Sequence, residues 1–195
     1  MRKQWFGDSR DYAKWSFIIN EASKDAVVCC VAMARPDILS ASIHPRVLSF
    51  FDRYKNLDLV RELFQDRYRS VSTQYYKSLH ESYFDEVMLM MRQAQLGNPV
   101  LVFVDPDTGI EPVSSGSNKH VRLADLRRVS EVLRPGDKLV VYQHAPIMRK
   151  PNWIDSAMLR LSGQPWLADF RLRSHYDQAC ASDVCFLVVE RIAGT

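Results

Sequence analysis

The stretch Val100-Leu101-Val102-Phe103-Val104-Asp105-Pro106 decides the fold. Its first five residues are apolar and mostly β-branched, which predicts a strand that is buried on both faces. Strands of this kind belong to parallel sheets that helices cover on either side. The Asp-Pro pair ends the strand, because proline has no backbone N–H to donate to a neighbouring strand.

Two further apolar runs predict neighbours for this strand. Ala26–Ala34 is continuous and closed by a proline, and Lys138–His144 has the same buried character. A helix predicted over Leu123–Leu133 separates residues 100–104 from residues 138–144, so this part of the chain has the strand-helix-strand pattern of a parallel sheet. The spacing also predicts helices over 10–23, 57–68, 82–95 and 153–161, and strands over 71–76, 168–176 and 183–192.

The last two predicted strands lie close together in sequence. Only residues 177–182 separate them, which is too short for a crossover helix, so we expect them to pair antiparallel. The prediction is therefore an α/β fold: a Rossmann-like three-layer sandwich with a mainly parallel sheet that ends in an antiparallel strand pair. Since there is no repeat and no Gly/Ser-rich linker, we expect a single domain over residues 1–195.

Composition narrows the class of protein. The chain has 195 residues, of which 47% are hydrophobic and 25% charged, as in ordinary globular proteins. A net charge of +3 permits nucleic-acid binding without requiring it. With no signal-like N-terminus and no apolar run of membrane-spanning length, we expect a cytoplasmic protein without a membrane partner. The four cysteines, Cys29, Cys30, Cys180 and Cys185, are expected to be buried free thiols.

The loop after the strand over residues 100–104 is the leading candidate for a catalytic or binding site. Asp105, Asp107 and Glu111 fall within seven residues, with Thr108 among them, at the strand end where parallel sheets bind ligands. Three carboxylates repel one another unless a cation, a proton or a donor-rich ligand is present. The alternative is a surface turn in which Gly109 supplies a positive φ; we favour the functional interpretation.

The strand over residues 138–144 ends in Gln143-His144 at the same predicted edge. Histidine suits a general base, a metal ligand or a hydrogen-bond donor. Alternation along a strand sends Gln143 and His144 to opposite faces, so we expect only one of them to face the site and favour His144.

Two more polar segments are candidates. Asp11 and Lys14 lie three apart at the start of the first predicted helix, and Asp8 precedes it, which fits either a functional cluster or a capped helix with an ordinary ion pair. Lys119 could meet a phosphate or balance the carboxylates, although a solvated loop lysine is the simpler interpretation.

The order of elements resembles the class I S-adenosylmethionine-dependent methyltransferases, whose sheet ends in a reversed hairpin. Asp105-Pro106-Asp107-Thr108 is similar to the Asp/Asn-Pro-Pro-aromatic motif of amino-methyltransferases that act on adenine in nucleic acid. Gly7-Asp8-x-x-Asp11-x-x-Lys14-Trp15 is similar to the Gly-Asn-x-x-Asp-x-x-Lys-His stretch of ribosomal-RNA adenine-N6 methyltransferases. The combined motifs also look like a group of uncharacterised bacterial and phage proteins.

The resemblance implies S-adenosylmethionine as cofactor and nucleic acid as partner. Asp105 would accept a hydrogen bond from the target amino group, Pro106 would shape the loop, and Lys14 would contact substrate or cofactor. The full set of candidates is Asp105, Asp107, His144 and Lys14 for catalysis, Asp8, Asp11, Asp37 and Pro106 for the cofactor, and Thr108, Glu111 and Lys119 for the substrate.

The sequence departs from the family pattern at two places, and two alternatives follow. Residues 34–38 contain no glycine where the family has a glycine-rich turn, and Asp107-Thr108 replace a proline and an aromatic. One alternative is a Mg²⁺- or Mn²⁺-dependent nuclease or phosphodiesterase that uses Asp105, Asp107 and Glu111. The other is a degenerate methyltransferase fold that serves as a binding subunit.

Overall fold

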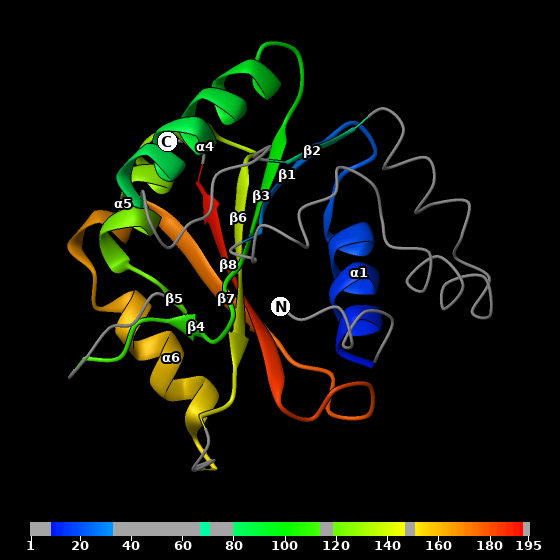
Figure 1. The fold of residues 1–195 in the computed structure, drawn as a ribbon, viewed down its shortest axis with the longest axis vertical. Helices are drawn as coiled ribbons and strands as arrows, with labels where there is room; N and C mark the ends of the chain where they lie inside the picture. The colour runs from blue at the N-terminus through cyan, green and yellow to red at the C-terminus, as the bar shows by residue number, and fades with distance from the viewer. Residues whose placement is uncertain (1–8, 33–66, 71–79, 114–118, 147–150, 193–195) are drawn as a thin grey trace.

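A computed structural model describes residues 9–32, 67–70, 80–113, 119–146 and 151–192 (Figure 1). Its elements, in chain order, are α1 (Ser9–Glu21), β1 (Val27–Ala32), β2 (Tyr68–Ser70), α4 (His80–Ala94), β3 (Val100–Asp105), β4 (Gly109–Ile110), β5 (His120–Val121), α5 (Leu123–Glu131), β6 (Lys138–His144), α6 (Trp153–Ser162), the 3₁₀ helix η2 (Pro165–Leu167), β7 (Phe170–His175) and β8 (Val184–Arg191).

The main sheet has six strands in the order β2-β1-β3-β6-β8-β7. The pairs β2–β1, β1–β3 and β3–β6 are parallel, whereas β8 is antiparallel to both β6 and β7. Among the described strands of this sheet, β8 alone runs in the opposite direction. This confirms the expected fold class, including the antiparallel pair formed by the last two strands.

The strand order reverses between β1 and β3. From β1 the chain moves outward to β2 on one side, and from β3 it moves to β6 on the other. Such a switch point opens a crevice at the carboxyl ends of the two central strands, where α/β proteins bind ligands. Ala32 and Asp105 form the last residue pair between β1 and β3, so Asp105 lies at the carboxyl end of β3, at the switch point.

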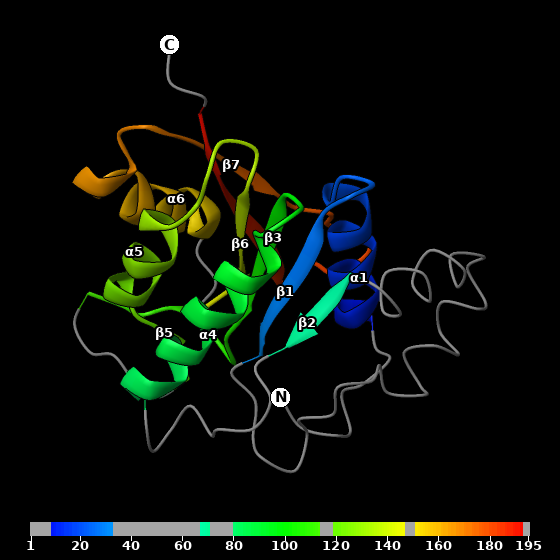
Figure 2. The ribbon, with the colours of Figure 1, turned by 90° about the horizontal axis from the view of Figure 1, so that it is seen from above.

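Helices cover both faces of the sheet, which makes three layers (Figure 2). Helix α1 packs on one face through Ala13, Phe17 and Ile18, and helices α4, α5 and α6 pack on the other. Alternation along β3 divides its side chains between the layers: Phe103 faces α1, whereas Val102 and Val104 face α4–α6. Both cores consist of apolar side chains removed from water, which is the main stabilising term of the fold.

Most predicted elements lie within one to three residues of the observed bounds, but one boundary was wrong. The helix expected over 57–68 ends on Tyr68, and this residue instead begins β2, where it pairs with Val28. The pairing with β1 outweighs the local helical pattern. The rest of that predicted helix and the strand expected over 71–76 lie outside the described residues.

The cysteines and helices bear on two further expectations. Cys29, Cys30 and Cys185 are free and buried, as expected, whereas Cys180 is only half-buried. Within the described ranges, every helix is too short or too polar to cross a bilayer.

Candidate functional site

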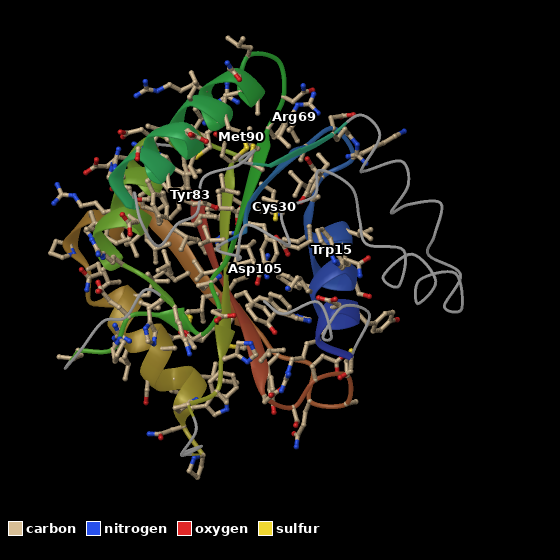
Figure 3. The ribbon with its side chains drawn as sticks, in the orientation of Figure 1. Trp15, Cys30, Arg69, Tyr83, Met90 and Asp105 are labelled. Atoms are coloured by element: carbon tan, nitrogen blue, oxygen red, sulfur yellow. The ribbon has the colours of Figure 1, made fainter. Side chains whose placement is uncertain are left out.

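Asp105, labelled in Figure 3, ends β3 at the switch point. On the α1 side of the sheet it meets Lys14. The Nζ atom of Lys14 donates a hydrogen bond of 2.8 Å to Oδ2 of Asp105. The lysine side chain is 2% exposed and the aspartate side chain 10%. The structure therefore joins two residues that the sequence had predicted independently, one from helix α1 and one from strand β3.

Two more of the described side chains lie near the Lys14 ammonium. Oδ1 of Asp11 lies 3.5 Å from Nζ, and the ring centroid of Tyr142 lies 4.7 Å away. Burial by itself would lower the pKa of Lys14, but the charges of Asp105 and Asp11 outweigh it and raise that pKa. Lys14 is consequently a permanent cation that fixes Asp105 in place.

Weakly polar groups border this cluster on the β1 and β2 side. Cys30 is buried beneath it, and Tyr68 is close enough to share a hydrogen bond with the thiol. Burial raises the pKa of Cys30 to about 12 and also raises the pKa of Tyr68. Both groups stay neutral at physiological pH, so they add hydrogen-bonding capacity without adding charge.

His144 lies on the same face as Lys14 and Asp105. Its ring makes an edge contact with Tyr142, with centroids 4.9 Å apart. Burial and the positive charge of Arg10 lower the pKa of His144, against the opposing effect of Asp183. A neutral imidazole can accept a proton at pH 7, so the geometry leaves His144 available as a base.

Gln143 faces the opposite side, as alternation predicted, yet it also belongs to the site. Its Oε1 accepts the N–H of Ile110 at 2.9 Å, and its Nε2 donates to the carbonyl oxygens of His144 at 2.8 Å and Thr108 at 3.3 Å. Gly109 has a φ of +112°, and a Cβ there would lie 2.4 Å from the Gln143 amide atoms. Gln143 and Gly109 thus clamp the loop that follows Asp105. The sequence reveals Gly109 as a turn residue, but not its partner.

Glu111 does not join Asp105. Oε1 of Glu111 accepts the N–H of Leu123 at 2.9 Å, at the start of α5 on the far side of the sheet. Asp107 is exposed at the loop tip. The expected convergence of all three carboxylates is therefore wrong, because the chain crosses the edge of the sheet after buried Pro106.

The substrate candidates after Asp107 have local partners. Thr108 donates from both its backbone N–H, at 3.1 Å, and its hydroxyl, at 2.8 Å, to the carbonyl oxygen of Lys119. Strands β4 and β5 form a small second sheet there. Glu111 acts as a cap for α5 and is not placed to meet a substrate beside Asp105. Of the cofactor candidates, Asp8 and Asp37 lie outside the described residues.

The described residues do not supply the ligand set that the metal-dependent alternative requires. In the described part of the chain, no three His, Cys, Asp or Glu side chains are grouped so that they could hold an ion. Asp105 is engaged by Lys14 and Glu111 by the α5 backbone. We therefore do not propose a Mg²⁺- or Mn²⁺-dependent hydrolase.

The strand order, with β8 reversed between β6 and β7, defines an α/β protein with a class I methyltransferase-like fold. A scan of protein-family models gives no match, and no curated protein matches. Solved structures do resemble it. The fibrillarin/Nop5p complex matches at 13% identity and a TM-score of 0.44, over 92% of this chain and 81% of that one.

Two more similar structures are named as ribosomal-RNA methylases. A putative one from Clostridium thermocellum has 13% identity and a TM-score of 0.41, over 95% of this chain and 98% of that chain. One from Streptococcus thermophilus has 9% identity and a TM-score of 0.43, over 94% and 98% of the two chains. At identities of 9–13% and TM-scores below 0.5, these similarities do not bear on the chemistry of this chain.

Proposed function

We propose that this protein is an S-adenosylmethionine-dependent methyltransferase that acts on an amino group of nucleic acid, with an adenine-like target. The observation that carries the proposal is the position of Asp105. Its carboxylate lies at the switch point of the sheet, fixed by a buried lysine, and is followed by a proline and a clamped loop. A rigid acceptor at this edge is what an amine needs in order to be oriented for reaction.

Asp105 would act through hydrogen bonding. Lys14 engages Oδ2, which leaves Oδ1 to accept an N–H of the target amino group. This bond would direct the nitrogen lone pair toward the methyl donor and hold the amine within reach. S-adenosylmethionine, when bound, would supply the methyl group to this nitrogen and leave as S-adenosylhomocysteine, and the nitrogen would lose one proton to a base of this chain.

Lys14 and His144 would have different roles. The raised pKa of Lys14 keeps it protonated, so it cannot serve as a base and instead positions Asp105. The lowered pKa of His144 keeps it neutral at pH 7, which suits the acceptor of the released proton. We retain Asp107, Thr108 and Lys119 as candidates for contacts with substrate.

The described residues fit the cofactor in one respect. S-adenosylmethionine, when bound, supplies an electrophilic methyl group on a positively charged sulfur. Asp11 and Asp105 place two carboxylates beside one ammonium at this edge, and negative charge favours a cationic donor. Asp11 and Pro106, with Asp8 and Asp37 from outside the described residues, stay our candidates for holding it.

The first experiment tests the cofactor. S-adenosylhomocysteine at millimolar concentration should raise the melting temperature, because a ligand that binds only the folded state stabilises it. An unchanged melting temperature with both S-adenosylhomocysteine and S-adenosylmethionine would refute the proposal and favour a binding subunit without catalysis.

The second experiment tests the site. Methyl transfer from labelled cofactor to adenine-containing single-stranded RNA and DNA should fall at least about 100-fold in Asp105→Ala. The control variant Asp155→Ala removes an exposed carboxylate from α6, on the opposite face of the sheet, and should leave the rate unchanged. Equal losses in the two variants would show that Asp105 has no special role.

A further inference from the structure

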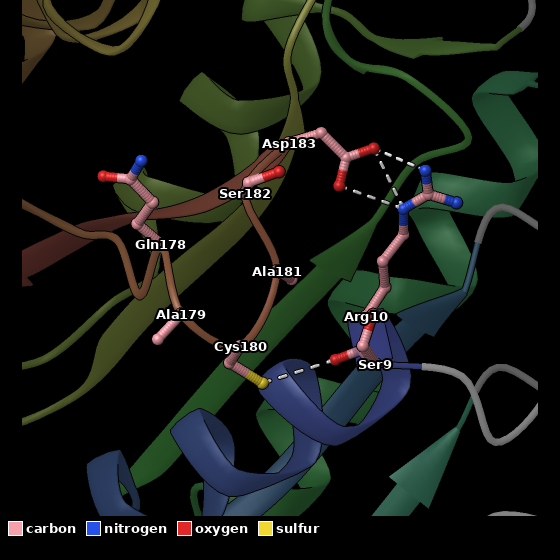
Figure 4. Close-up of a pocket in the computed structure, with 8 residues that line it drawn as sticks. All are labelled: Ser9, Arg10, Gln178, Ala179, Cys180, Ala181, Ser182 and Asp183. Carbon is pink, nitrogen blue, oxygen red and sulfur yellow. Dashed lines mark hydrogen bonds and ion pairs between the residues drawn. The ribbon is translucent and has the colours of Figure 1, made fainter.

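The first turn of α1 and the turn between β7 and β8 enclose a pocket of about 470 Å³ (Figure 4). This volume is within the usual range for small-molecule sites. Two of the side chains that line it are alanines. The lining residues are Ser9, Arg10, Gln178, Ala179, Cys180, Ala181, Ser182 and Asp183.

The turn that forms one wall is held rigid by its own hydrogen bonds. Oδ1 of Asp177 accepts the N–H groups of Ala179 at 3.1 Å and Cys180 at 3.2 Å. The hydroxyl of Tyr176 donates to the carbonyl oxygen of Ser182 at 2.9 Å. A ligand would therefore meet a wall that is already formed, which lowers the entropic cost of binding.

An ion pair forms the other wall. The Nε atom of Arg10 lies 3.1 Å from both carboxylate oxygens of Asp183, and Nη2 donates to Oδ2 as well. Because the carboxylate already balances the guanidinium, the pocket suits an uncharged, hydrogen-bonding ligand better than a phosphate. The pair also fixes the plane of the guanidinium, a surface on which nucleobases stack.

The pocket adjoins the proposed active site. Arg10 and Lys14 are four residues apart on α1, so they project from the same side of the helix about one turn, roughly 5.4 Å, apart. The charges of Arg10, Asp183, Lys14 and Asp105 all act on His144, so His144 lies near both ion pairs. Val184, which pairs with His144 between β6 and β8, directly follows the lining residue Asp183 in the chain. Neighbouring nucleotides of an extended strand can span this separation.

We infer that this pocket binds the nucleoside part of the nucleotide next to the target in a single nucleic-acid strand. The inference rests on the proposed function, since it takes the amine at Asp105 to belong to the same strand. Gln178 and Ser182 supply an amide and a hydroxyl for the base edge or the sugar. The two alanines supply the apolar contact.

The test is binding of a fluorescein-labelled single-stranded oligonucleotide of mixed sequence, as RNA and as DNA, measured by anisotropy. Ala179→Trp adds a large side chain to the lining of the pocket and should weaken binding about tenfold, the effect of losing one stacked base. Gln178→Leu keeps the size of the side chain but removes the amide, and should weaken binding several-fold. The control Ala168→Trp changes an exposed alanine just before β7, at the end of that strand opposite to the pocket. It should leave affinity within about twofold.

Salt dependence and competition by adenosine show whether the variants lose an uncharged nucleoside contact or a phosphate contact. The salt dependence of binding should be the same in wild type and Ala179→Trp, because an uncharged contact releases no counterions. Free adenosine should compete with the oligonucleotide more strongly in wild type than in Ala179→Trp, in which only the proposed target site at Asp105 remains.

The outcomes distinguish this inference from the proposed function. Wild-type affinity in both pocket variants would overturn the inference alone. Absence of oligonucleotide binding by the wild type would overturn both the inference and the nucleic-acid substrate of the proposed function. Neither result bears on the cofactor, which the melting-temperature experiment tests separately. Conversely, loss of binding in the pocket variants supports the inference even if no methyl group is transferred.

Discussion

Lys14 of α1 and Asp105 of β3 form one buried ion pair, although 91 positions separate them in the chain. A buried pair of this kind stabilises little relative to an apolar pair, but removal of one partner leaves an uncompensated charge. The pair therefore connects α1 to the switch point, and its removal should lower both the stability and the activity of the protein.

This coupling predicts a large interaction energy in a double-mutant cycle. Lys14→Met should cost about 3–5 kcal/mol, because it leaves the carboxylates of Asp105 and Asp11 without their ammonium. The double variant with Asp105→Asn should lose less than the sum of the single variants, by about 2 kcal/mol. Urea unfolding measures all four proteins.

The matched control is an exposed pair. Arg127 and Glu131 are 2.7 Å apart on α5 with 60% and 53% of their side chains exposed. Their coupling should be about 0.3–0.5 kcal/mol. If the buried pair couples no more strongly than this exposed pair, Lys14 does not hold Asp105 by its charge.

The clamp predicts that two glycines respond differently to alanine. Gly136 has a φ of +89° and no neighbour within 4 Å of an added Cβ, so Gly136→Ala should cost about 1 kcal/mol from backbone strain alone. Gly109→Ala adds a collision with the Gln143 amide and should cost about 2 kcal/mol more. Denaturant unfolding gives both values, and similar costs would show that the loop can move aside freely.

His144 predicts a pH dependence of stability. Its pKa is lowered in the folded protein, so below the ordinary value of about 6.5 the unfolded chain binds a proton that the folded protein does not. The stabilisation is complete above pH 6.5 and is lost as the pH falls through 6.5 toward the folded pKa. His144→Gln should therefore lose less free energy of unfolding than wild type between pH 7.5 and 5.5.

That comparison must be made as a difference between the two proteins at each pH. Burial raises the pKa of Asp125 to about 6, so protonation of this group increases the free energy of unfolding as the pH falls through 6. It is common to wild type and variant, so it cancels. Parallel curves for the two proteins would exclude a proton-linked role for His144.

Glu111 predicts a structural effect without a metal effect. Glu111→Ala removes the acceptor for the Leu123 N–H and should cost about 1 kcal/mol, as loss of a helix cap does. Glu111→Gln keeps an acceptor and should cost much less. Millimolar Mg²⁺ or Mn²⁺ should leave the melting temperature of all three proteins unchanged; a rise that depends on Glu111 would revive the metal alternative.

The sequence predicted the elements well because their patterns are local. Continuous apolar runs marked β1, β3 and β6, and the short connection between the last strands fixed their antiparallel pairing. Tyr68 was misplaced because β2 is only three residues long and depends on pairing with β1. Such a strand has no periodicity of its own to detect.

For the site, the sequence by itself determined that Asp105 ends a buried strand and that Lys14 lies one turn into the first helix. Only the tertiary structure decided that these two charges meet, that Glu111 turns to α5, and that Gln143 clamps Gly109. Alternation fixes the direction of a side chain only while the strand continues. Beyond Pro106 the path of the chain depends on side-chain hydrogen bonds with residues 11–35 positions away, which no local pattern encodes.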